Sequence, residues 1–62
     1  MVFYFDVYYK VENSKIIGRL STFIIARSIL QAREELNARL KEYHKEFAFN
    51  AYSVKFRGCD TL

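Results

Sequence analysis

Residues 29–47 place apolar side chains three or four positions apart, which is the spacing of one face of an α-helix. The residues in front of them suit a helix start. Ser28 can accept a hydrogen bond from the Gln31 amide while the Gln31 side chain reaches back, as in a capping box. We therefore expect a helix over roughly 28–45. Its apolar stripe comprises Ile29, Ala32, Leu36, Leu40, Tyr43 and Phe47.

A helix with a single apolar stripe must pack it against another surface, and the rest of the chain predicts strands. Residues 2–11 alternate apolar odd positions with amphipathic or charged even positions, which is typical of a half-buried strand. Residues 12–15 have turn chemistry, and residues 16–26 predict a second strand, antiparallel to the first, in which Gly18 marks a bulge. Residues 47–57 predict a third strand.

Residues 20–27 leave an alternative open. The helical stripe could extend backwards from Ile29 through Ile25 to Thr22, which would give one helix over 22–46. The run Phe23-Ile24-Ile25 is aromatic and β-branched, and Ser28 is a good cap, so a strand followed by a new helix is favoured.

The predicted fold is α+β, with the order β-β-α-β and one helix on one face of a small antiparallel three-stranded sheet. A chain of 62 residues with 52% hydrophobic and 18% aromatic residues is one globular domain and not a disordered segment. We expect the domain over 1–58 and a short tail over 59–62. The predicted covered face comprises Phe3, Phe5, Val7, Tyr9, Leu20, Ile24, Tyr52, Val54 and Phe56.

The other face of the sheet is the candidate site, because one helix covers only one face. It gathers aromatic rings and cations, a combination on which single-stranded nucleic acid stacks its bases and lays its phosphates. The same residues suit a protein contact or a dimer interface. Asp6 is expected to pair there with Arg19 or Lys55. The predicted binding residues are Tyr4, Tyr8, Lys10, Arg19, Phe23, Phe49, Lys55 and Arg57.

Chain length and composition limit which metals, cofactors, substrates and protein partners we expect. A domain of this length buries only about 60% of its unfolded surface, and one Cys and one His offer neither a disulfide framework nor a metal cluster. We therefore expect a homodimer, with no metal or cofactor. A three-strand, one-helix domain has little interior for a substrate pocket, so we expect neither catalysis nor a small-molecule substrate.

The function expected from these observations is that of a small non-catalytic binding protein. It is a protein-interaction or accessory module that homodimerises; the alternative is a single-stranded nucleic-acid-binding protein that uses the open aromatic and basic face. The net charge of +3 permits an acidic partner of either kind. No signal peptide or apolar spanning run is recognisable, which predicts a cytoplasmic protein away from membranes. For a chain this short, we expect the accessory protein, such as an inhibitor, of a phage or mobile element.

Overall fold

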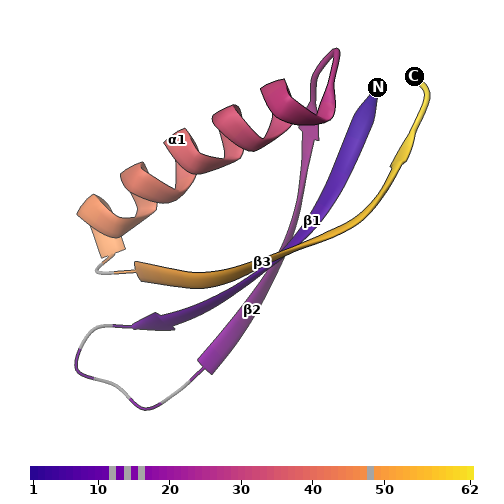
Figure 1. Cartoon of the computed structure of the whole chain (residues 1–62). Helices are drawn as coiled ribbons and strands as arrows, with labels where there is room; N and C mark the ends of the chain where they lie inside the picture. Colours follow the sequence, from indigo (N-terminus) through magenta and orange to yellow (C-terminus); the bar gives the residue numbers. More distant parts are fainter. Residues whose placement is uncertain (12, 14, 16, 48) are drawn as a thin grey trace.

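The computed structural model describes residues 1–11, 13, 15, 17–47 and 49–62, with side chains for all of these except 49, 51 and 52. The elements follow the predicted order. They are β1 (Val2–Val11), β2 (Ile17–Ile25), α1 (Ile29–Phe47) and β3 (Phe49–Asp60), as Figure 1 shows. The α+β prediction, with one helix between the second and third strands, is confirmed.

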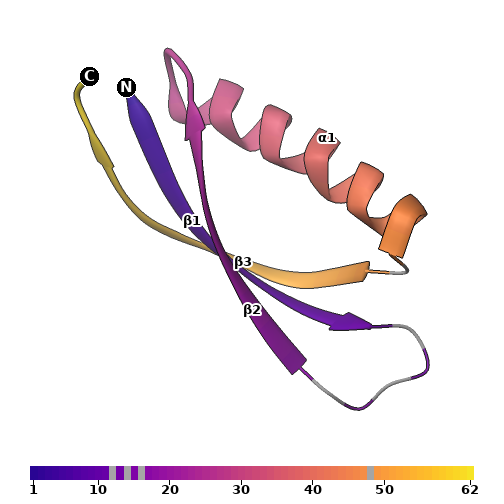
Figure 2. The ribbon, with the colours of Figure 1, turned by 180° about the vertical axis from the view of Figure 1, so that it is seen from behind.

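The sheet has the order β2-β1-β3, and both outer strands run antiparallel to β1. The two outer strands are therefore parallel to each other, and α1 must carry the chain from one edge of the sheet to the other. It begins beside the end of β2 and finishes beside the start of β3, so it crosses one face diagonally (Figures 1 and 2). The opposite face carries no helix.

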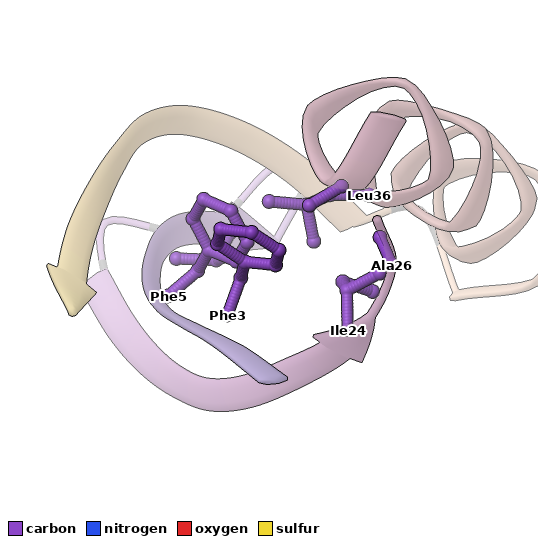
Figure 3. Packing of buried hydrophobic residues seen from close by; sticks show 7 residues of the cluster. Phe3, Phe5, Ile24, Ala26 and Leu36 are labelled. Atoms are coloured by element: carbon purple, nitrogen blue, oxygen red, sulfur yellow. The ribbon is translucent and has the colours of Figure 1, made fainter. Parts of the chain in front are cut away.

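The hydrophobic core lies under the first half of α1. The odd positions of β1 supply its centre, because Phe3, Phe5 and Val7 are at most 3% exposed. Ala32 and Leu36 of the helical stripe close over them, as Figure 3 shows for Leu36. The buried apolar residues are Phe3, Phe5, Val7, Ile24, Ala26, Ala32 and Leu36, and the partly buried ones packed against them are Leu20, Ile29, Leu40 and Val54.

Two residues predicted for the covered face are less covered than expected. Phe56 is 39% exposed, although its ring centroid lies 5.7 Å from that of Phe5. Tyr9 is only half-buried. The diagonal path of α1 explains both, because it leaves the end of β3 and the start of β2 outside its cover. Tyr52, predicted for the same face, has its side chain outside the described part of the structure.

The start of α1 forms as the capping box predicts. The Gln31 amide donates to Ser28 Oγ at 3.2 Å, and Gln31 Oε1 accepts from the Arg27 amide at 2.8 Å. These contacts satisfy one backbone donor in the first turn, the Gln31 amide, and one in front of it, the Arg27 amide. The alternative helix over 22–46 is wrong, because β2 continues to Ile25 and the new helix begins at Ile29. The helix ends at Phe47, two residues later than expected.

The third strand begins and ends later than predicted. It spans Phe49–Asp60 instead of 47–57, and Cys59 and Asp60, expected in a tail, pair with Phe3 and Val2. Sequence reasoning treated Gly58 as the end of the strand. Its φ of 142° instead allows a register shift beside it, after which pairing with β1 resumes.

The turn and second strand are close to expectation, with one error. Asn13, in the predicted turn, has a φ of 64°, a conformation that Asn adopts more readily than most residues. Glu12, Ser14 and Ile16 lie outside the described residues. The bulge predicted at Gly18 is wrong, since the pairing of β1 with β2 is continuous through Tyr9 and Gly18. A Cβ at position 18 would overlap the Tyr9 ring in its present position, so a larger residue there would displace that ring.

Leu36 and Leu30 test how much of the stability depends on this small core. Leu36 is 3% exposed and Leu30 is 72% exposed, and both lie in α1. Leu36→Ala should lower the free energy of unfolding by about 2–5 kcal/mol, because it leaves a cavity. Leu30→Ala should change it by less than about 0.5 kcal/mol. Urea unfolding followed by circular dichroism measures both, and equal losses would contradict this placement of the core.

Candidate functional site

The candidate site is the face of the sheet opposite α1, here called the open face. Directly paired residues of neighbouring strands share a face, so the even positions of β1 define it. The open face comprises Val2, Tyr4, Asp6, Tyr8 and Lys10 of β1, Ile17, Arg19, Ser21, Phe23 and Ile25 of β2, and Asn50, Ser53, Lys55, Arg57, Gly58 and Asp60 of β3.

Seven of the eight predicted binding residues come together on this face. Six are placed by strand register, and Arg57 is placed by its contact with Asp6. Phe49 differs, because its backbone pairs with Val11, an odd position of β1. Its side chain lies outside the described part of the structure, so its prediction as a binding residue is not tested.

A buried carboxylate sits at the centre of the open face. Asp6 is 6% exposed, its Oδ1 accepts a hydrogen bond from Ser21 Oγ at 2.8 Å, and its Oδ2 lies 3.5 Å from Arg57 Nε. Burying a carboxylate is costly unless it is paired and hydrogen-bonded, and these two partners meet that requirement. The predicted partners, Arg19 or Lys55, are wrong. The register shift between Tyr4 and Phe5 places Arg57 beside the carboxylate instead.

One end of the open face is apolar. Val2 pairs with Ile25 and Tyr4 pairs with Phe23, so their side chains form a contiguous group, here called the apolar end. Phe23 is 56%, Ile25 55% and Tyr4 39% exposed. Val2 and Ile25 were not among the predicted binding residues. Val2 lies two positions from Tyr4, and Ile25 lies two positions from Phe23, so strand alternation places them on the same face. This spacing could have identified them from the sequence.

The last residue of β3, Asp60, acts on Tyr4 at the apolar end. The Asp60 carboxylate raises the pKa of Tyr4 above its ordinary 10.0, chiefly as a hydrogen-bond acceptor for the neutral hydroxyl, with smaller effects of desolvation and of the negative charge.

The other end of the open face is cationic. It consists of Tyr8, Lys10, Arg19 and Lys55, here called the cationic end. Tyr8 pairs with Arg19 on β2 and Asp6 pairs with Lys55 on β3, so cations from three strands surround one half-buried ring. No ion pair joins these three cations to any described carboxylate. Their charge is therefore directed to solvent or to a ligand.

The edges of the sheet are less suited to binding than its face. On β2, Arg39 Nη1 donates to the Phe23 carbonyl oxygen at 3.4 Å, so the helix occupies one backbone acceptor of that strand. On β3, two register shifts interrupt the regular ladder. Bulges and covering side chains are common protection against strand addition. Capture of a partner is therefore better argued for the face.

Other reactive side chains do not gather into a site. Cys59 is a free, exposed thiol, and no group of three or more His, Cys, Asp or Glu side chains that could hold a metal occurs among the described residues. The expectation of a non-catalytic protein stays a prediction. Among the described residues, no helix is long and apolar enough to cross a bilayer.

Comparison with known proteins gives no family. No protein-family model, no curated protein and no solved structure matches this chain. The open face is therefore the main indication of function.

Two serine variants test whether the hydrogen bond to the buried Asp6 carboxylate stabilises the fold. Ser21→Ala removes the hydroxyl donor of a buried carboxylate, so we expect the free energy of unfolding to fall by about 1–2 kcal/mol. Ser53, exposed on β3, is the matched control, and Ser53→Ala should stay within about 0.5 kcal/mol of the wild type. Urea denaturation measures both variants. If Ser21→Ala lowers the free energy of unfolding no more than Ser53→Ala does, the hydrogen bond from Ser21 does not stabilise the buried Asp6 carboxylate.

The Tyr4 contact makes a prediction about pH. Because the pKa of Tyr4 is raised in the folded chain, the contact stabilises the fold below the ordinary Tyr pKa, and its contribution is lost as pH rises through the raised value. Asp60→Asn should lower the pKa of Tyr4 towards 10.0, because it removes the carboxylate that causes the rise. An NMR titration of the Tyr4 ring carbons measures it. An unchanged Tyr4 pKa in the variant would show that Asp60 is not the cause.

Proposed function

We propose that this chain is a small non-catalytic binding protein of the cytoplasm that homodimerises and captures a protein partner on the open face of its sheet. The observation that carries the proposal is the apolar end, where Phe23 and Ile25 are each more than half exposed on a regular strand. Contiguous exposed apolar side chains on a small domain are typical of interaction surfaces. The protein acts as an accessory or inhibitory factor by occupying its partner's surface.

The chemistry of the open face specifies the partner. The apolar end suits an apolar patch, and the adjacent cationic end offers Lys10, Arg19 and Lys55, none of which has an ion-pair partner among the described residues. Complementary charge around an apolar centre increases association rate and specificity. The proposed partner is therefore a protein surface with an apolar patch flanked by carboxylates.

The small core supports self-association. Seven apolar residues make up the buried cluster of the described chain, and one helix covers part of one face. Domains of this size are marginally stable alone and gain stability by burying further apolar surface against a partner. Homodimer formation supplies such burial whether or not the protein partner is present.

Single-stranded nucleic acid is the second candidate, and the cationic end favours it. A half-buried Tyr8 among three cations is the arrangement on which a base stacks while phosphates meet the charges. Two observations weigh against it. Arg57 is already engaged by Asp6, which leaves one cation fewer for phosphates, and Asp60 places a carboxylate beside Tyr4 at the other end of the face.

The protein partner is tested by capture from extracts of the cells that make the chain. The immobilised wild type should retain a protein that Phe23→Asp loses, because the substitution places a charge in the apolar end. Leu30→Asp is the matched control, since Leu30 is 72% exposed on α1, and it should retain the protein. A protein retained equally by all three would not bind the open face, and the proposal would fail.

The nucleic-acid candidate is tested by light scattering with a single strand of about 20 nucleotides, a length that spans more than one single-domain site, at low and high salt. We expect no change in mass. A mass increase at low salt that disappears at high salt, and that Tyr8→Ala and Arg19→Ala both abolish, would instead establish the cationic end as a nucleic-acid platform.

A further inference from the structure

The helix-covered side of the sheet contains a second apolar surface. Because α1 crosses diagonally, it leaves uncovered the corner where β1 ends and β2 begins (Figures 1 and 2). A groove of about 360 Å³ opens there, lined by Tyr9, Val11, Leu20, Tyr43 and Phe47. It is here called the corner groove.

The corner groove continues the hydrophobic core outwards. Leu20 packs against the buried cluster, and Tyr43 and Phe47 are the last two members of the apolar stripe of α1. Exposure rises along this path, from half-buried Tyr9 to Val11 at 41% and Phe47 at 63%. The stripe is therefore longer than the sheet beneath it can cover, and its final turns present aromatic rings beside an open groove.

The floor of the corner groove is shaped by a cross-strand pair. Tyr9 lies opposite Gly18, and its ring occupies the space that a side chain at position 18 would need. An aromatic ring laid over a glycine of the neighbouring strand is a recurrent means of fixing strand register. Tyr9 thus presents an apolar surface between the strands and the end of the helix.

We propose that a second copy of this chain occupies the corner groove, with the Phe47 ring of each copy entering the groove of the other around a two-fold axis. The proposal rests on the proposed homodimer and assigns its interface. A two-fold contact requires one surface to present both a projection and a complementary hollow. Phe47, largely exposed at the rim of the groove that it helps to line, meets that requirement.

Charge favours this interface over the open face. The lining of the corner groove contains no Asp, Glu, Lys, Arg or His, and residues 28–46, which include most of α1, hold four cations and four carboxylates. Two copies can meet there without net repulsion. A two-fold contact through the open face would instead bring the cationic ends of both copies to one interface, with Lys10, Arg19 and Lys55 contributed by each. Pairing through the groove leaves the open face available to the protein partner.

Sedimentation equilibrium of the full chain tests this assignment with two matched phenylalanines. Phe47 is 63% and Phe23 56% exposed, so neither substitution empties the core. The wild type and Phe23→Asp should both have twice the chain mass of 7.4 kDa, whereas Phe47→Asp should have the mass of one chain. Circular dichroism checks that each variant is folded.

The milder pair Phe47→Ala and Phe23→Ala decides the question if Phe47→Asp fails to fold. Truncation of a central aromatic anchor should raise the dissociation constant of the dimer about tenfold or more for Phe47→Ala, and leave it unchanged for Phe23→Ala. Equal dissociation constants for this pair, or a dimer that survives Phe47→Asp, would overturn the assignment.

Two other outcomes separate the assignment from the proposed homodimer. A wild type with the mass of one chain would refute the homodimer and the interface together. A dimer that Phe23→Asp dissociates and Phe47→Asp does not would keep the homodimer, place its interface on the open face, and overturn the assignment to the corner groove.

Discussion

The diagonal crossing of α1 determines most of what this molecule exposes. One helix must carry the chain between the two edges of a three-stranded sheet, and it buries only what lies beneath its path. The core therefore gathers around Phe3, Phe5 and Leu36, where the first half of the helix meets the sheet. Several other apolar residues are left partly exposed, among them Phe23 and Ile25 on the open face and Val11 and Phe47 in the corner groove. Both candidate binding surfaces are therefore parts of the sheet that the helix does not cover.

Local features were predictable from the sequence, and the features set by tertiary packing were not. The cap at Ser28, the alternation along β1 and the gathering of seven predicted binding residues on one face depend on residue spacing, which can be read from the sequence. The ion pair of Asp6 with Arg57 depends on the register shift between β1 and β3. Because residue spacing does not reveal this shift, Arg57 could not be predicted as the partner of Asp6. The exposure of Phe56 depended on where the helix crosses, which hydrophobic periodicity does not specify.

The two ends of the open face suit different parts of one task. In the proposed function, Phe23 and Ile25 would supply the apolar contact surface, and the cationic end would attract and orient an approaching acidic partner. Asp6 and its two partners keep the middle of the face fixed, so both ends are presented on a rigid ladder of strands. Self-association through the corner groove would display two such faces from one dimer, which increases the apparent affinity for a partner that is itself multivalent.

The most direct test of the whole account is an isotope-filtered NOE experiment on a mixture of labelled and unlabelled protein, because it reports only contacts between copies. The account predicts intermolecular NOEs from the Phe47 ring to the methyl groups of Leu20 and Val11, the groove residues of the other copy. Intermolecular NOEs confined to Phe23 and Ile25, or none at a concentration where sedimentation shows a dimer, would contradict it.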